Sequence, residues 1–155
     1  MSDILKEIVS EHDEARELLD QIANARTKHV DYMKELYATL YGHHRAEEAV
    51  AFPPVKELDE EGKKLIAELR KEHTESETLL LDLIKKSEGE DKADMDKEMF
   101  EKLDKDVRDH MEEEETDYFK KAKEAMTAKE LKDALDPFEE EEEKEKEKAE
   151  EKVGI

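Results

Sequence analysis

The chain has 155 residues and a formal net charge of −21, and 48% of its residues are charged. So large an excess of acidic groups repels phosphate backbones and anionic lipids, so we expect no nucleic-acid partner and no membrane partner. The sequence contains no cysteine, which excludes disulfides, zinc–thiolate sites, thiolate-held iron–sulfur clusters and cysteine nucleophiles, so any metal site must use histidine and carboxylate.

The first two predicted helices lie in the N-terminal third of the chain. One covers about residues 2–25, with Ser2 or Asp3 as its N-cap. The next covers about residues 29–51 and is expected to end at Pro53 and Pro54. Apolar residues and one histidine recur on one face of each helix at steps of three and four. These faces contain Leu5, Ile8, His12, Ala15, Leu19 and Ile22 in the first helix, and Met33, Leu36, Leu40, His43, Glu47 and Val50 in the second.

Two further helices are predicted, over about residues 59–87 and 93–127, and Gly89 is expected to close the first of them. Hydrophobic residues make up 35% of the chain and no alternating strand pattern is visible. We therefore predict an all-α fold, an up-down-up-down four-helix bundle over residues 1–127. The buried faces of this second pair contain Leu65, Leu69, His73, Ser76, Leu80 and Leu83, and then Met99, Leu103, Val107, His110, Glu114 and Tyr118.

Residues 128–155 are expected to form a separate unit with an acidic tail. Leu131, Leu135 and Phe138 are candidates to dock a short helix on the bundle. The following segment, Glu139 to Lys152, holds nine Glu, four Lys and one Ala. Because it has no apolar stripe to bury, we expect a charged helix or a disordered tail outside the domain.

The second helix pair looks like a divergent copy of the first. The segment from Glu11 to Leu19 resembles the segment from Glu72 to Leu80, which lies 61 residues later. The segment from His43 to Phe52 resembles the segment from His110 to Phe119, which lies 67 residues later. Each copy carries one histidine on its first helix and a His-x-x-x-Glu pair on its second, so polar residues repeat together with apolar ones.

Four histidines lie on the apolar faces of four different helices. In an antiparallel bundle, residues near the middle of neighbouring helices meet at similar heights, so these imidazoles are predicted to meet in the core. A glutamate four residues after a histidine lies on the same helix face. Two buried carboxylates repel each other unless cations neutralise them. The candidate metal ligands are therefore His12, His43, Glu47, His73, His110 and Glu114.

Six ligands are too many for one tetrahedral ion and suit two ions that share Glu47 and Glu114. The repeat assigns His12 and His43 to one ion and His73 and His110 to the other. Imidazole and carboxylate together favour iron, manganese, zinc or copper over calcium or magnesium. Glu77, four residues after His73, is the candidate for a seventh ligand.

The remaining polar residues near these faces are expected to have lesser roles. His29 and His44 are placed on the surface or in support of the ligands, and Glu48 and Glu115 are expected to point sideways. Glu48 is a candidate to support a ligand histidine. Tyr37, Tyr41 and Tyr118 are expected to pack in or near the core.

Several enzyme motifs are absent. No Glu-x-x-His pair of the ferritin-like carboxylate type is present, and no histidine is followed by glutamate, which removes the His-Glu-x-x-His zinc protease motif. The sequence also lacks a glycine-rich phosphate loop and a Gly-x-Ser-x-Gly nucleophile turn. The sequence therefore contains none of these motifs to indicate a hydrolase or a nucleotide-binding protein.

The chain resembles the hemerythrin-like, or HHE cation-binding, family over about residues 1–125, and the segments that carry the resemblance are Glu11-His12, His43 to Pro53, Glu72-His73 and His110 to Glu114. The resemblance implies a four-helix bundle around a non-haem di-iron centre held by the six candidate ligands. Oxygen-carrying members have a second histidine four residues after the ligand of the third helix, where this chain has Glu77. They also tend to have an acidic residue five positions after the last histidine, so here Glu114 and Glu115 compete for the bridging role.

The leading hypothesis is thus a binding protein with two non-haem iron ions, bridged by carboxylates, that takes up dioxygen or a related small molecule such as nitric oxide. Sensing, storage and iron handling are the roles considered. The alternatives are a di-iron enzyme acting on peroxide, nitric oxide or ferrous iron, and a purely structural or interaction bundle. The sequence does not identify a protein partner. Without a signal peptide or a run of about 18 apolar residues, a cytoplasmic location is expected.

Overall fold

The computed structural model describes residues 2–25, 29–88 and 96–155, and these are helical throughout apart from short connections. No strand occurs in them. The elements are α1 (Ile4–Asn24), α2 (His29–Ala46), a π-helical turn (Glu47–Ala51), α3 (Phe52–Lys56), α4 (Glu60–Ser87), α5 (Lys97–Glu113), a second π-helical turn (Glu114–Tyr118), α6 (Phe119–Ala125), α7 (Ala128–Asp133) and α8 (Leu135–Val153).

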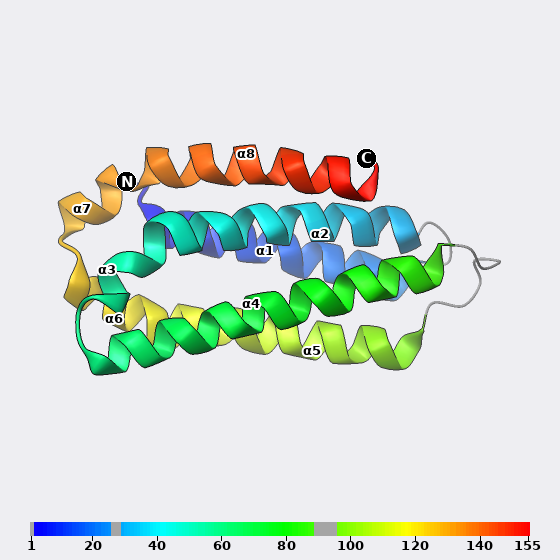
Figure 1. Ribbon diagram of the computed structural model, residues 1–155, viewed down its shortest axis with the longest axis horizontal. Helices are drawn as coiled ribbons and strands as arrows, with labels where there is room; N and C mark the ends of the chain where they lie inside the picture. The colour runs from blue at the N-terminus through cyan, green and yellow to red at the C-terminus, as the bar shows by residue number, and fades with distance from the viewer. Residues whose placement is uncertain (1, 26–28, 89–95) are drawn as a thin grey trace.

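Four helical rods lie side by side and alternate in direction, as Figure 1 shows. The rods are α1, then α2 with α3, then α4, then α5 with α6. The prediction of an all-α bundle is confirmed. The rods of α1, α4 and α5 begin where short acidic side chains satisfy free N–H groups of the first turn: Asp3 accepts from the Lys6 N–H, Asp59 from Gly62 and Asp96 from Met99. The predicted stop at Gly89 and the predicted start near residue 93 lie outside the described residues.

The second rod differs from its prediction at the two prolines. It does not end there but continues as α3 to Lys56, with Pro53 and Pro54 in the first turn of that helix. Just before them the chain widens into the π-helical turn, in which the Phe52 N–H donates to the Glu47 carbonyl. Proline is tolerated in a first helical turn because its missing N–H is not needed there. The turn therefore lets the rod pass the prolines.

The Glu-rich C-terminal segment forms the charged helix that was one of the two expectations for it. The helix α8 lies along the outer side of α2 (Figure 1), so it does not stand apart in solvent. Phe138 is fully buried and Ala149 is 2% exposed, and the Lys152 ammonium lies 5.9 Å from the centre of the Tyr37 ring. Two apolar anchors, Phe138 and Ala149, and the stems of long charged residues thus replace the missing apolar stripe. The domain boundary after residue 127 stays a prediction.

Gly42 allows α8 to approach α2 closely. A Cβ atom at this position would lie 2.8 Å from the Glu142 carbonyl oxygen and 2.9 Å from the Lys146 Cβ. Helix propensity alone predicts that Gly42→Ala stabilises by about 1 kcal/mol. We expect the opposite sign, a loss of roughly 1–2 kcal/mol, because the carbonyl belongs to a rigid helix backbone. Urea unfolding measures this difference, and a gain in stability would contradict the packing of α8 described above.

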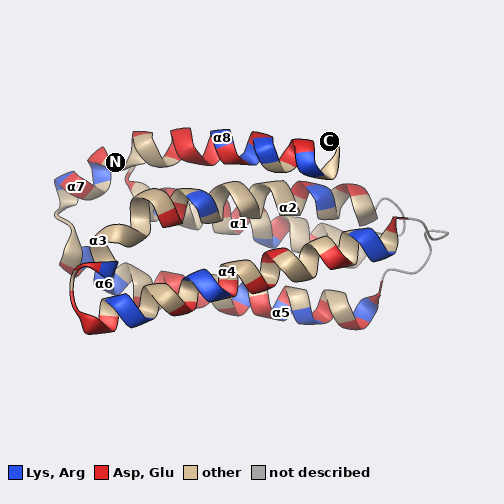
Figure 2. Ribbon diagram, in the orientation of Figure 1, with Lys and Arg blue, Asp and Glu red and all other residues tan. Residues whose placement is uncertain are grey.

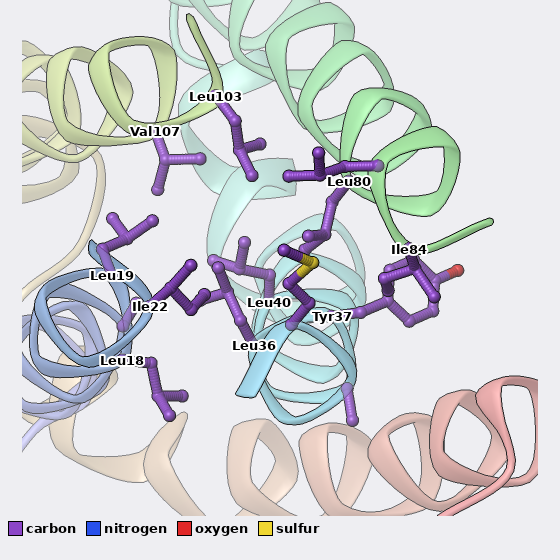
Figure 3. Packing of buried hydrophobic residues seen from close by; sticks show 14 of the residues in the cluster. Leu18, Leu19, Ile22, Leu36, Tyr37, Leu40, Leu80, Ile84, Leu103 and Val107 are labelled. Atoms are coloured by element: carbon purple, nitrogen blue, oxygen red, sulfur yellow. The ribbon is translucent and has the colours of Figure 1, made fainter. Parts of the chain in front are cut away.

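Two apolar clusters fill the bundle and leave a layer between them. One contains side chains of α1, α2, α4 and α5, several of which point toward one another in Figure 3, and the other gathers around α3, α6 and α7. On α1 the first cluster begins at Ala15 and the second ends at Ile8, so His12 lies between them. The same holds on α2, where His43 lies between Leu40 and Ala46.

The outer surface of the molecule is strongly charged. Figure 2 shows acidic and basic residues interspersed along the ribbons of α4, α5 and α8. Within the described ranges, no helix combines the length and apolarity that a membrane span requires.

Candidate metal centre

All six predicted ligands lie in the polar layer between the two apolar clusters, and all six are buried. Their nitrogen and oxygen atoms fall into two sets whose members lie within 4.8 Å of one another. The structure therefore brings together the residues that the repeat pairs, and both sets contain the same two glutamates. The sets are His12, His43, Glu47 and Glu114, and Glu47, His73, His110 and Glu114.

The Nε2 atoms of the four histidines face the two shared carboxylates. His12 Nε2 lies 3.1 Å from Glu114 Oε1, and His110 Nε2 lies 2.8 Å from Glu114 Oε2. His43 Nε2 lies 3.3 Å from Glu47 Oε2. His73 Nε2 reaches both glutamates, at 3.1 Å from Glu47 and 3.4 Å from Glu114. Four nitrogen atoms and four oxygen atoms thus lie close together in one small volume.

Several of these atoms have no hydrogen-bond partner although they are buried. They are His43 Nε2, His110 Nε2 and both carboxylate oxygens of Glu47. A buried carboxylate without partners costs several kcal/mol, so such atoms call for an unseen partner. Two divalent cations would satisfy the unpaired nitrogens and oxygens at once, and imidazole with carboxylate is a ligand set for iron, manganese or zinc. The residues present therefore fit a metal centre.

The Nδ1 atom of each of the four histidines donates to a different glutamate. The distances are 2.7 Å from His12 to Glu115, 2.7 Å from His43 to Glu11, 2.8 Å from His73 to Glu48 and 2.7 Å from His110 to Glu72. Such a bond fixes the tautomer, so that Nε2 carries the lone pair, and it fixes the ring orientation. Each of these four histidines is thus oriented to ligate through Nε2.

These supporting glutamates follow the internal repeat. Each lies next to a ligand in the sequence, either before a histidine or after a glutamate, and each supports a histidine on a neighbouring helix. The sequence reasoning predicted that Glu48 and Glu115 point sideways, and this is confirmed. The sequence did not lead us to predict that Glu11 and Glu72 support histidines. The available signal was their repeated position, directly before His12 and His73 in the two matched segments.

The two π-helical turns begin at the two shared glutamates, Glu47 and Glu114. Because the turns are 67 residues apart, they repeat like the ligands. Hydrogen bonds that skip five residues widen the helix, and such turns are common at functional sites. The Tyr118 hydroxyl closes the first turn by donating to the Ala51 carbonyl. Tyr37 and Tyr118 are buried, as expected, and Tyr41 is half-buried against the first apolar cluster.

Glu77 lies outside both ligand sets. It accepts from His44 Nδ1 at 2.7 Å and from Arg45 at 2.8 Å. His44 itself is not on the surface, contrary to one of the two expectations, since it is only 3% exposed and its ring stacks on that of His73 at 3.7 Å. The matching position in the second half of the chain is Met111, so this contact breaks the two-fold symmetry of the site. His29 lies at the start of α2, with Nε2 2.7 Å from the Ala25 carbonyl oxygen.

Burial and charge act in opposite directions on the ligands. Burial favours neutral imidazole, but the nearby carboxylates outweigh it and raise the pKa of His12, His43, His73 and His110. Burial likewise disfavours an ionised Glu114, yet His110 and His12 hold its pKa well below the usual value. For His44, burial and the neighbouring histidines both lower the pKa. The centre therefore attracts positive charge, which protons or metal ions can supply.

A cavity of about 270 Å³ opens between α4 and α5 and has His110 in its wall. Its lining is largely acidic and includes Glu68, Glu72 and Glu113. Negative walls raise the local concentration of cations. The cavity therefore attracts cations to the side of the centre on which His110 lies.

Comparison with known proteins agrees with this geometry. A family model described as "Hemerythrin HHE cation binding domain" matches residues 3–122, which include all six predicted ligands and both π-helical turns. No curated protein and no solved structure matches the chain significantly.

Proposed function

Because the chain belongs to the hemerythrin HHE cation-binding domain family, we propose that its buried centre holds two non-haem iron ions. The ligands in this proposal are His12, His43, Glu47, His73, His110 and Glu114, with the two glutamates shared between the ions. The observation that carries it is the pair of four-residue sets that have Glu47 and Glu114 in common. The unpartnered Nε2 and carboxylate atoms in these sets support it further.

In this proposal Glu114, rather than Glu115, is the second shared carboxylate. Glu114 is fully buried and lies in both ligand sets. Glu115 is occupied elsewhere, since it accepts from His12 Nδ1 and from Arg16 at 2.7 Å each. Glu77 is likewise engaged by His44 and Arg45, so it is not assigned as a ligand.

We infer that the protein binds dioxygen or a related small molecule, such as nitric oxide, as a sensor or store or in iron handling. Iron would supply a redox couple and open positions for such a ligand. The chain's own residues supply the surroundings. Leu40, Leu69 and Val107 are buried next to the polar layer and limit the access of water. The four supporting glutamates hold each imidazole in place, and hydrogen bonds of this kind tune metal affinity and potential.

The test is metal analysis of the purified protein together with its visible absorption spectrum, recorded after anaerobic reduction and again after oxygen is readmitted. We expect about two irons per chain, as two sets of His and Glu ligands require, and a spectrum that responds to oxygen reversibly. If the two irons oxidise irreversibly and a steady-state assay shows continuous consumption of peroxide or nitric oxide, the protein is an enzyme and not a binding protein. A protein that holds no iron even after reconstitution would overturn the proposal.

A further inference from the structure

A separate group of carboxylates lies where α8 contacts α1. One carboxylate oxygen each from Glu7, Glu11 and Glu142 lies within 4.8 Å of the others. Glu7 and Glu142 are half-buried, whereas Glu11 is only 5% exposed. The group therefore joins the surface of the molecule to a buried side chain.

The buried member of this group has an unsatisfied atom. Glu11 Oε1 accepts from His43 Nδ1 at 2.7 Å, but Glu11 Oε2 is buried and has no hydrogen-bond partner. Burying an unpaired carboxylate oxygen is unfavourable, and two further carboxylates beside it add repulsion. Across the described ranges, no ion pair joins a lysine or arginine to any of the three glutamates. Apart from the His43 imidazole on Glu11 Oε1, no basic side chain of the described residues offsets the negative charge of the three carboxylates.

We propose that Glu7, Glu11 and Glu142 bind a divalent cation that prefers oxygen ligands, of the class that Ca²⁺ represents. Three carboxylates without imidazole form a hard ligand set, and water completes the six to eight oxygens that Ca²⁺ takes. This chemistry differs from that of the histidine-containing centre, which favours transition metals. A cation here would fasten α8 to α1 and would hold the carboxylate that orients His43.

Calcium titration by calorimetry tests this proposal, using the 155-residue chain after reconstitution with iron, in 0.15 M KCl to screen diffuse attraction by the net charge. We expect one Ca²⁺ to bind per chain and Glu142→Gln to weaken its binding at least tenfold. Glu143→Gln is the matched control, because it removes the same charge at the next, exposed position of α8. Calcium should also raise the unfolding temperature of the wild type and of the control, but not that of Glu142→Gln.

Equal calcium binding by Glu142→Gln and Glu143→Gln, or none by the wild type, would overturn the proposal. Glu7→Gln provides a second variant, on the other helix of the site, and should weaken calcium binding in the same way. The iron content of every preparation is measured separately. A variant that loses calcium binding but keeps a normal iron content therefore tests only the carboxylate site. A protein that contains no iron tests only the proposed function.

Discussion

Replacing His73 by alanine is expected to reduce the metal content from about two ions per chain to one or fewer, and to weaken the remaining binding. His73 is fully buried, and its Nε2 atom is close to both shared glutamates, at 3.1 Å from Glu47 and 3.4 Å from Glu114. Its removal therefore takes a nitrogen from one ion and leaves both carboxylates less compensated. Metal analysis after dialysis against a fixed free iron concentration measures the loss.

The milder variant Glu48→Ala provides a comparison for the size of the metal loss in His73→Ala. Glu48→Ala removes the acceptor of His73 Nδ1, at 2.8 Å, and of Arg45, at 3.1 Å, and keeps all six proposed ligands. Loss of such a supporting carboxylate typically costs roughly 10–100-fold in metal affinity. The His73→Ala loss should exceed that range, because a ligand itself is gone. If the two variants lose metal equally, His73 acts by orientation and not by ligation.

The control for truncating a histidine is His29→Ala. His29 lies at the start of α2, away from both ligand sets, and contacts the Ala25 carbonyl. We expect its metal content to equal that of the wild type. Circular dichroism checks that each variant keeps its helices, and His73→Gln replaces most of the lost volume if the alanine variant does not fold. Unchanged metal stoichiometry in a folded His73 variant would refute the ligand assignment.

The helices and the six meeting residues follow from sequence because both depend on short-range periodicity. Apolar residues that recur at steps of three and four predict a buried helix face. Helix geometry alone places His43 and Glu47 on the same face. The internal repeat then indicates which faces meet. Nothing beyond helix pitch, bundle topology and the cost of burying carboxylates is needed for this part of the prediction.

Other features depend on contacts between helices that no local pattern encodes. The widened turns at Glu47 and Glu114 have no distinct residue signature, and Pro53 and Pro54 suggested an end where the rod continues. The pairing of Glu11 with His43 joins residues 32 positions apart. The packing of α8 rests on close approach at Gly42 and on two anchors, Phe138 and Ala149, rather than on an apolar stripe.

Removal of the metal is expected to lower the unfolding temperature by about 10 °C for each site. An ion that binds only the folded state adds about 4 kcal/mol when its free concentration is 1,000 times its Kd. For a chain of this size, each kcal/mol changes the unfolding temperature by about 2–4 °C. Thermal unfolding followed by circular dichroism, with and without a chelator and again after iron is restored, measures the difference. In His73→Ala the chelator should lower the unfolding temperature by no more than half as much as it does in the wild type.

The stability of the metal-free protein depends on pH, and the directions of the pKa shifts say how. In the metal-free protein the raised pKa values of His12, His43, His73 and His110 stabilise the fold at low pH, below the unfolded value of about 6.5. That stabilisation is lost as the pH rises through the raised values. Burial raises the pKa of Glu77 to about 7, which acts in the same direction. The lowered pKa of Glu114 contributes stability that is present above the usual carboxyl pKa and is lost only as the pH falls below it, outside the range in which the histidines titrate.

Metal binding has the opposite dependence, because the imidazoles must lose their protons before they can ligate. Between pH 6 and pH 8 the metal-free protein should therefore become less stable while the metal contributes more. The gap in unfolding temperature between the loaded and the chelated protein should widen over this range. A gap that is constant or narrows with pH would mean that the buried histidines do not exchange protons for metal. The fold would then be held by imidazolium–carboxylate pairs alone, and the chelator would have no specific target in the core.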